Sequence, residues 1–227
     1  MSVDRIRDHF EAEAGEFDRI ILNLIPDYPE MVEAIVAAIP FDRSARLEVI
    51  DLGCGTGTVA QAVLAAFPHA HLTCLDLAEK MVAVAQTKLR HHRNVSYITG
   101  NFENFEGRYD VVLSSLALHH LQTDEDKRRF YRRVYENLAS GGAFYNADLV
   151  LASSAALQQV YLQKWRAFMK RAISEEEIDT KWIPKYLDED RPAKLLDQLS
   201  WLVEIGFAYV DVLWKHYNFA VYGGLKR

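Results

Sequence analysis

Val49-Ile50-Asp51-Leu52-Gly53-Cys54-Gly55-Thr56-Gly57 decides the fold, because an apolar run leads through an acid into three alternating glycines. Residues 47–50 predict a buried strand, and Thr58–Ala66 predicts the helix after the turn. The glycines allow a sharp turn and let a ligand approach the backbone without a Cβ in the way. Residues 72–75 predict a second strand ending at Asp76, whose carboxylate can accept both hydroxyls of a ribose. This order of strand, glycine loop, helix, strand and acid predicts a nucleotide-type cofactor site.

The alternation of strands and helices continues to about residue 150. Further strands are expected at residues 95–98, 110–114 and 143–149. The helices between them carry apolar stripes at Met81, Val84, Ala85 and Leu89, and at Phe130, Val134 and Leu138. Gly141-Gly142 is expected to end the second of these helices. The alternation predicts an α/β fold with a doubly wound, Rossmann-like and mostly parallel sheet.

The glycine pattern differs from the dinucleotide fingerprint G-x-G-x-x-G, because an acid stands two residues before the first glycine. The form D-L-G-C-G-T-G resembles the first motif of class I S-adenosylmethionine-dependent methyltransferases, and the resemblance covers residues 46–150. It implies S-adenosylmethionine as cofactor. The loop would hold the methionine part, the first acid would place its amino group, and the second acid would bind the ribose. The implied contacts are Asp51, Gly53, Cys54, Gly55, Gly57, Asp76, Leu77 and Met81.

Two further cofactor contacts are expected after the third strand, at Asn101 and Phe102. The family often has an acid at the position of Asn101, accepting from the adenine amino group. The amide oxygen of Asn101 can accept the same bond without charge, and Phe102 can stack on adenine. The alternative is that Asn101 caps a turn and Phe102 fills the core. Ser114 and Leu116 are expected to contact the cofactor as well, because ligands bind at the carboxyl ends of strands in open α/β sheets.

Catalytic candidates follow the fourth and fifth strands. Residues 114–120 resemble the "xxLxxHHL" run of the family, and His119 or His120 could serve as a base near neutral pH. Asp148 could face the substrate as a base or hydrogen-bond acceptor. The alternatives are structural: one histidine packs against the cofactor, the other bonds a backbone carbonyl, and Asp148 caps the next segment. No metal is expected, because adjacent histidines project differently and no carboxylate or cysteine has suitable spacing.

The flanking segments predict covers for the site. In related methyltransferases a segment like residues 1–45 forms a helical lid over the cofactor, which Phe10 and Phe17 could close. Residues 151–191 are expected to form a helical insertion over the substrate. Residues 192–227 are expected to add a helix and a β-hairpin with an antiparallel strand to the core at 46–150. Aromatic and basic candidates for the substrate pocket, or alternatively for the core of the lid, are Tyr28, Trp165, Arg166, Trp182, Tyr186 and Tyr217.

Composition limits the class of protein. A chain of 227 residues, half of them hydrophobic, suits one α/β domain with an added lid. The net charge of −6 argues against a nucleic-acid-binding surface over the whole protein. The basic runs at residues 88–93 and 127–133 lie among acids and are read as solvated helix faces rather than an RNA patch. Cys54 and Cys74 are too few for a disulfide framework. With no membrane-spanning run and no secretory signal, we expect a cytoplasmic protein; a homodimer is left open.

The aromatic-rich residues 201–224 resemble the ending of carboxy-S-adenosylmethionine synthases, which feed tRNA wobble-uridine modification. Those enzymes need an arginine to pair with the cofactor carboxylate. The corresponding place here, Lys181-Trp182-Ile183, has no arginine, and a lysine cannot donate two parallel hydrogen bonds to a carboxylate as a guanidinium does.

The sequence therefore predicts a methyltransferase for a small-molecule acceptor. The rivals are a carboxy-cofactor synthase, which would consume prephenate, and a cofactor-binding protein without catalysis.

Overall fold

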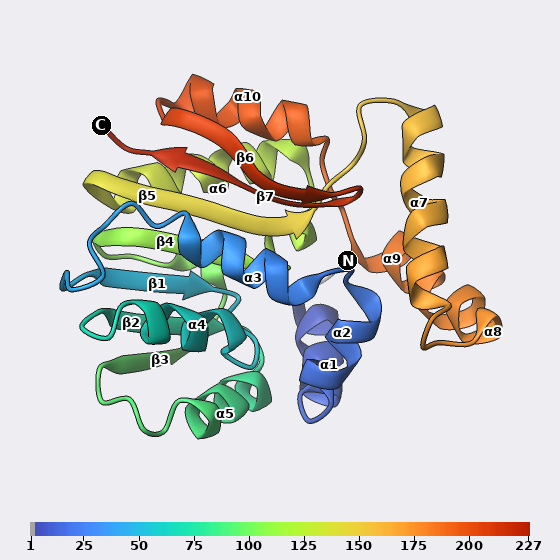
Figure 1. Cartoon of the computed structure of the whole chain (residues 1–227), viewed down its shortest axis with the longest axis horizontal. Coiled ribbons are helices and arrows are strands. Elements are labelled where there is room, and N and C mark those ends of the chain that lie inside the picture. The colour runs from blue at the N-terminus through green and yellow to red at the C-terminus, as the bar shows by residue number, and fades with distance from the viewer. Residues whose placement is uncertain (1–2) are drawn as a thin grey trace.

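The computed structural model describes residues 3–227, and its centre is a seven-stranded sheet in the order β3-β2-β1-β4-β5-β7-β6 (Figure 1). The strands β1 to β5 run parallel to one another, and β7 runs antiparallel to both β5 and β6. The strands are β1 Glu48–Leu52, β2 His71–Asp76, β3 Val95–Thr99, β4 Tyr109–Ser115, β5 Leu138–Leu149, β6 Ala208–His216 and β7 Phe219–Leu225. This topology confirms the predicted doubly wound sheet with an antiparallel C-terminal strand.

Helices cover both faces of the sheet, which is why its central strands are mostly apolar rather than alternating between apolar and polar residues. Val49, Ile50 and Leu52 of β1 are fully buried. The helices α3 Tyr28–Ala37, α4 Thr58–Ala66 and α5 Glu79–Lys88 lie on one side, and α6 Asp124–Asn137 and α10 Leu195–Ile205 lie on the other (Figure 1). Two apolar cores result, one on each face of the sheet.

The remaining helices gather at the carboxyl ends of the strands (Figure 1). They are α1 Val3–Glu13, α2 Phe17–Leu24, α7 Ala155–Met169, α8 Glu175–Glu177 and α9 Ile183–Glu189, with a π-helical turn at Ile178–Trp182. Helices from the two ends of the chain meet here: α2 packs on α7, and Glu13 of α1 pairs with Lys185 of α9 at 3.2 Å. We call this group the cover helices. Within the described residues, no helix is both long and apolar enough to cross a membrane.

The structure corrects two predicted boundaries. The helix expected to end at Gly141-Gly142 ends at Asn137, and the glycines lie inside β5. The register against β4 shifts there, since Tyr109 pairs with Leu138 and Val111 with Ala143. The helix expected from Pro192 begins at Leu195, because the segment before it runs beside Leu151, whose N–H donates to the carbonyl of Ala193. In both places a strand pairing overrides the local preference for helix.

The glycine loop after β1 brings two strand ends into contact. Gly53 and Gly57 adopt positive φ angles of 73° and 80°, a region that costs other residues about 1–2 kcal/mol. A Cβ on Gly53 would lie 2.4 Å from the Cβ of Ala117, in the loop after β4. A Cβ on Gly57 would lie 3.1 Å from the Cβ of Ala85 in α5. The absence of side chains at the two glycines therefore allows the close approach of both the β4 loop and α5.

We predict that Gly53→Ala destabilises the protein more than Gly141→Ala. Gly141 has a similar φ of 78°, but a methyl group added there would meet no atom within 4 Å. The Gly141→Ala variant therefore measures the cost of the backbone conformation without a steric clash. We expect about 1 kcal/mol for Gly141→Ala, and at least about 2 kcal/mol for Gly53→Ala because the clash adds to strain. Urea denaturation of the two variants measures the difference. Equal losses would show that Ala117 moves away at no cost.

Candidate active site

Two cavities lie side by side at the carboxyl edge of the sheet. The loop cavity, of about 200 Å³, is enclosed by the loops after β1, β2, β3 and β4 and by residues of α1 and α2. It sits where β1 and β4 diverge, the usual ligand position in such sheets. The helix cavity, of about 110 Å³, lies among α2, α7, α9 and the end of β5. The side chains that line both cavities, and so form their shared wall, are Phe10, Phe17, Leu116 and His120.

Most of the predicted cofactor residues line the loop cavity: Asp51, Gly53, Cys54, Gly55, Asp76, Leu77, Met81, Asn101, Phe102 and Leu116. The structure corrects two others. Ser114 is fully buried and donates to the carbonyl of Leu52 at 2.7 Å, so its hydroxyl joins β4 to β1. Its neighbour Ser115 lines the cavity instead. Gly57 lies behind the loop against α5.

Asn101 combines the two roles that the sequence left open. Its Oδ1 accepts the N–H of Glu103 at 2.9 Å and caps the short helix Phe102–Asn104, while the residue still lines the loop cavity. Phe102 packs edge-on against Phe130 at a centroid distance of 5.3 Å, and also lines the cavity. The local turn therefore fixes both side chains at the cavity wall.

Asp51 is a buried acid without a partner. Its side chain is 1% exposed, and neither carboxylate oxygen receives a hydrogen bond of ordinary geometry within residues 3–227. Burial and the nearby Asp76 raise the pKa of Asp51 to about 7. Asp76 is better satisfied, since it accepts the N–H groups of Gly55 at 2.8 Å and Ala78 at 2.9 Å. A buried, unpaired carboxylate in a cavity is costly, and a cationic ligand group would compensate it.

The cover helices are tied to the glycine loop through Asp18 of α2. Its Oδ1 accepts the hydroxyl of Thr56 at 2.5 Å, and its Oδ2 lies 2.7 Å from the ammonium group of Lys88 in α5. Phe17, beside it, lies 4.0 Å from the position of a Cβ on Gly55. The loop cavity is therefore closed on its outer side by α2.

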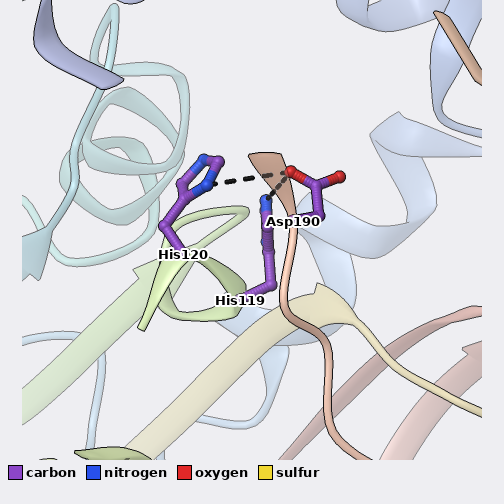
Figure 2. Close-up of side chains that lie close together, drawn as sticks. All are labelled: His119, His120 and Asp190. Atoms are coloured by element: carbon purple, nitrogen blue, oxygen red, sulfur yellow. Dashed lines mark ion pairs between the residues drawn. The ribbon is translucent and has the colours of Figure 1, made fainter. Parts of the chain in front are cut away.

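A cluster of two histidines and two carboxylates lies beside the helix cavity, and Figure 2 shows three of its members, His119, His120 and Asp190. His119 and His120 lie in the short helix Leu118–His120 after β4, and their ring centroids are 4.2 Å apart. Asp148 on β5 holds His119 Nδ1 at 2.5 Å. Asp190, just after α9, places Oδ1 3.5 Å from His119 Nε2 and 3.7 Å from His120 Nδ1. The N–H of Arg191 donates to the carbonyl of His119 at 2.9 Å and fixes this approach.

The charges of this cluster correct the predicted roles. Burial disfavours the charged form of His119, but Asp148 and Asp190 outweigh it and raise its pKa to about 10. His119 is therefore an imidazolium at neutral pH and has no free lone pair for a base. Burial and the charge of His119 lower the pKa of His120 to about 3, so His120 is neutral and its Nδ1 lacks a hydrogen bond.

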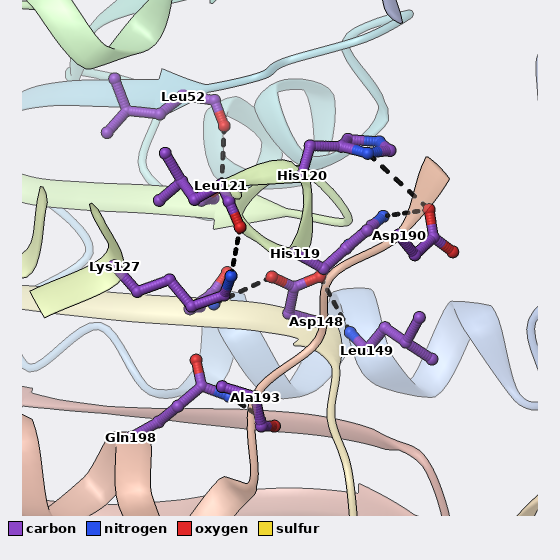
Figure 3. Close-up of polar contacts among 12 residues, drawn as sticks. Leu52, His119, His120, Leu121, Lys127, Asp148, Leu149, Asp190, Ala193 and Gln198 are labelled. Atoms are coloured by element: carbon purple, nitrogen blue, oxygen red, sulfur yellow. Dashed lines mark hydrogen bonds and ion pairs between the residues drawn. The ribbon is translucent and has the colours of Figure 1, made fainter. Parts of the chain in front are cut away.

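Asp148 lines neither cavity. It lies beneath His119, where it also accepts the N–H of Leu149 at 2.8 Å and the amide of Asn146 at 3.2 Å (Figure 3). Its carboxylate therefore orients His119 from behind. The predicted role of Asp148 as a base is replaced by this positioning role.

The predicted substrate residues divide into three groups. Trp165, Trp182 and Tyr186 line the helix cavity, whereas Tyr28 lines the loop cavity. Arg166 pairs with Asp179, and Tyr217, in the turn between β6 and β7, packs on Tyr161. Neither lines one of the two cavities. The indole N–H groups of Trp165 and Trp182 are used within the protein, on the Leu24 carbonyl and the Glu177 carboxylate. These tryptophans therefore offer apolar surface to a ligand.

Sequence reasoning missed Asp190, which lines the helix cavity. Asp190 follows His120 by 70 residues and ends the acidic run Asp188-Glu189-Asp190, which resembles any exposed helix end. No local pattern distinguishes it from its neighbours. Its position depends on how α9 docks against α1 and the β4 loop.

Comparison with known proteins agrees with the sheet and the loop cavity. Residues 49–142 match the family described as "Methyltransferase domain". The strand order with antiparallel β7 is typical of the class I methyltransferases. The chain contains a class I S-adenosylmethionine-dependent methyltransferase domain. The cofactor of this class of domain is S-adenosylmethionine.

Relatives of this methyltransferase domain differ in their reactions. A malonyl-[acyl-carrier protein] O-methyltransferase of Bacillus cereus is 31% identical over 138 residues, covering 60% of this chain and 49% of that protein. The chain thus spans about half the length of this relative. A carboxy-S-adenosyl-L-methionine synthase of Trichodesmium erythraeum is 26% identical over 226 residues, covering 96% of this chain and 88% of that protein. Human N-acetylserotonin methyltransferase, solved with S-adenosylmethionine, superposes with a TM-score of 0.63 at 16% identity, covering 97% of this chain and 56% of that one.

We predict that Asp51→Asn stabilises the ligand-free protein, and more so at high pH. Folding raises the pKa of this carboxyl from 3.8 to about 7, so the folded protein holds the proton more tightly than the unfolded chain does. Wild-type stability therefore falls as pH rises from about 4 through 7, by up to about 4 kcal/mol. Asparagine removes this loss. Urea denaturation at pH 5 and pH 8 should show the gap between variant and wild type widening; a gap independent of pH would contradict the prediction.

Proposed function

We propose that the chain binds S-adenosylmethionine in the loop cavity and transfers its methyl group to a small-molecule acceptor in the helix cavity. The observation that carries the proposal is the unpaired buried carboxylate of Asp51 beside Asp76 and the glycine loop. The cofactor has an amino group and a sulfonium, both cationic, and a ribose. One cavity therefore offers an acid for the amino group and a second acid for the ribose.

The fit extends to the adenine end. Asn101 and Phe102 line the same cavity as Asp76, with Met81 and Leu77 beside them. Asn101 Oδ1 already accepts one hydrogen bond, and a carbonyl oxygen has two lone pairs, so it can accept a second from an adenine amino group. Apolar side chains supply contact area for the ring. The residues present therefore suit each part of the cofactor.

When bound, the cofactor supplies an electrophilic methyl on sulfur. Asp51, Asp76 and the glycine loop would hold the cofactor, and an electron pair of the acceptor would take the methyl and displace the sulfur as a neutral thioether. The chain aligns the acceptor through the shared wall, where Phe10, Phe17 and Leu116 also exclude water. His120, neutral and with Nδ1 free of a hydrogen bond, accepts the acceptor's O–H or N–H and orients its lone pair. Any proton lost by the acceptor passes to His120 or to water.

A small acceptor is favoured by the size and enclosure of the helix cavity. The cavity is about 110 Å³, and helices from both ends of the chain surround it. Its walls are mainly apolar and aromatic, and the charged and histidine side chains among them are Glu13, His119, His120, Lys185, Glu189 and Asp190. Sites of this kind bind compact, largely apolar molecules with one polar end.

A carboxy-S-adenosylmethionine synthase is the second candidate, because relatives with that name align over nearly the whole chain. The charges in the helix cavity favour methyl transfer instead. No arginine is found among the described residues that line it, and Lys185 is paired with Glu13 at 3.2 Å. Lys181 is half exposed and lies over the ring of Trp182. A carboxylate on the cofactor would therefore meet no free bidentate partner.

We predict that Asp51→Asn and Asp76→Asn each weaken S-adenosylmethionine binding at least about tenfold, since each removes a charged acceptor. Isothermal titration calorimetry measures the affinity. Asp211→Asn is the matched control, because Asp211 is an exposed acid on β6 far from the cavity, and its affinity should equal that of wild type. Wild-type affinity in both cavity variants would refute the cofactor site.

We predict that native mass spectrometry of the purified protein releases S-adenosylmethionine or its demethylated product, and that prephenate is not consumed. Turnover is then followed with an acceptor screen. Release of a species heavier by a carboxylate, together with loss of prephenate, would establish the synthase reaction. Binding of S-adenosylmethionine without turnover of any acceptor would instead favour a protein that binds the cofactor without catalysis.

A further inference from the structure

Three potential metal ligands converge on the wall of the helix cavity. They are His119 Nε2, His120 Nδ1 and Asp190 Oδ1, which all lie within 4.8 Å of one another (Figure 2). The reasoning that excluded a metal from the sequence fails here on both counts. The two rings lie side by side with centroids 4.2 Å apart, and α9 delivers the missing carboxylate.

The spacing of the ligand atoms fits a shared ion better than direct contact. Asp190 Oδ1 is 3.5 Å from His119 Nε2 and 3.7 Å from His120 Nδ1. Both distances exceed an ordinary hydrogen bond. Two ligands bound to one tetrahedral ion at about 2.1 Å would be separated by ~3.4 Å. His120 Nδ1 is buried and lacks a hydrogen bond, so it has a lone pair for an ion.

Asp148 supplies the outer partner that metal-binding histidines usually have. It holds His119 Nδ1 at 2.5 Å, which leaves Nε2 of the same ring directed at Asp190 (Figure 3). Leu149 N–H and Asn146 fix the carboxylate in turn. The carboxylate of Asp148 on β5 therefore orients His119, and His119 in turn presents Nε2 to the proposed ligand site. This arrangement does not depend on mobile surface groups.

We propose that His119, His120 and Asp190 bind one divalent first-row transition-metal ion. Two imidazoles and one carboxylate suit Zn²⁺ or Fe²⁺ better than Mg²⁺ or Ca²⁺, which prefer oxygen ligands. The ion takes the place of the proton that the two carboxylates otherwise hold on His119. Because all three ligands line the helix cavity, its remaining coordination positions open into that cavity. A bound ion uses the Nδ1 lone pair of His120 that the methyl-transfer proposal gives to the acceptor, so the two occupants of this nitrogen exclude each other. Ion binding in the absence of acceptor does not depend on the methyl-transfer proposal.

The test is calorimetric titration of the tag-free, chelator-treated protein with Zn²⁺ in the absence of cofactor. We expect one ion per chain in wild type, and at least a tenfold weaker affinity in Asp190→Asn and in His120→Ala, since even outer partners contribute tenfold or more. Two controls should bind like wild type. The double variant His91→Ala/His92→Ala removes an exposed adjacent histidine pair, and Asp188→Asn removes an exposed acid two residues from Asp190.

Cobalt substitution gives a second measurement that does not require the variants to fold. Co²⁺ bound by the cluster should give a visible ligand-field band without a thiolate charge-transfer band, whereas binding at Cys54 or Cys74 would show the latter. A wild type that binds no ion would overturn the proposal. Loss of Zn²⁺ affinity only in the His91→Ala/His92→Ala control would also overturn the proposal, and so would a thiolate charge-transfer band in the Co²⁺ spectrum. None of these outcomes bears on cofactor binding, which is measured separately with Asp51→Asn.

Discussion

The contact between Gly53 and Ala117 is the constraint on which the site depends. Gly53 leaves β1 with a φ of 73°, and its Cα faces the side chain of Ala117 with no room for a methyl group. The loops after β1 and β4 are therefore locked together at the point where the two halves of the sheet diverge. One loop carries the wall of the loop cavity, and the other continues directly into His119 and His120. A single close approach thus sets the distance between the cofactor cavity and the histidine cluster.

Electrostatics divides the site into an unsatisfied half and a satisfied half. In the loop cavity, burial raises the pKa of both Asp51 and Asp76, and Asp51 has no partner among the described residues. In the cluster, His119 stands between Asp148 and Asp190, which lowers the pKa of Asp190 against the effect of burial. Protein interiors tolerate unpaired charge only at a cost in stability. The loop cavity bears that cost, which is consistent with a site whose stabilising cation is the ligand.

The cover helices, rather than the matched domain, supply most of the wall of the helix cavity. The matched methyltransferase domain ends at residue 142, whereas most residues lining the helix cavity come from α1, α2, α7 and α9. These helices are joined by exposed or half-exposed ion pairs such as Arg5 with Asp188, which contribute little. Aromatic packing of Trp165 against Tyr186 and Phe219 supplies the larger share of the contact. The acceptor site proposed here therefore lies largely outside the matched domain.

The sequence alone determined the sheet, the glycine loop and most of the residues that line the loop cavity, because contiguous patterns specify them and strand direction places their ends at one edge. It also identified His119 and His120, but not their charge states. Only the tertiary structure decided which acid meets the histidines and which serine faces the cavity. Ser114 and Ser115 are equivalent by type, and the pleat of β4 points one inward and the other toward the cavity. Asp190 reaches His119 through the docking of α9. Local sequence records the preferences of neighbouring residues, whereas the pKa of a buried group is set by whatever distant residue folds against it.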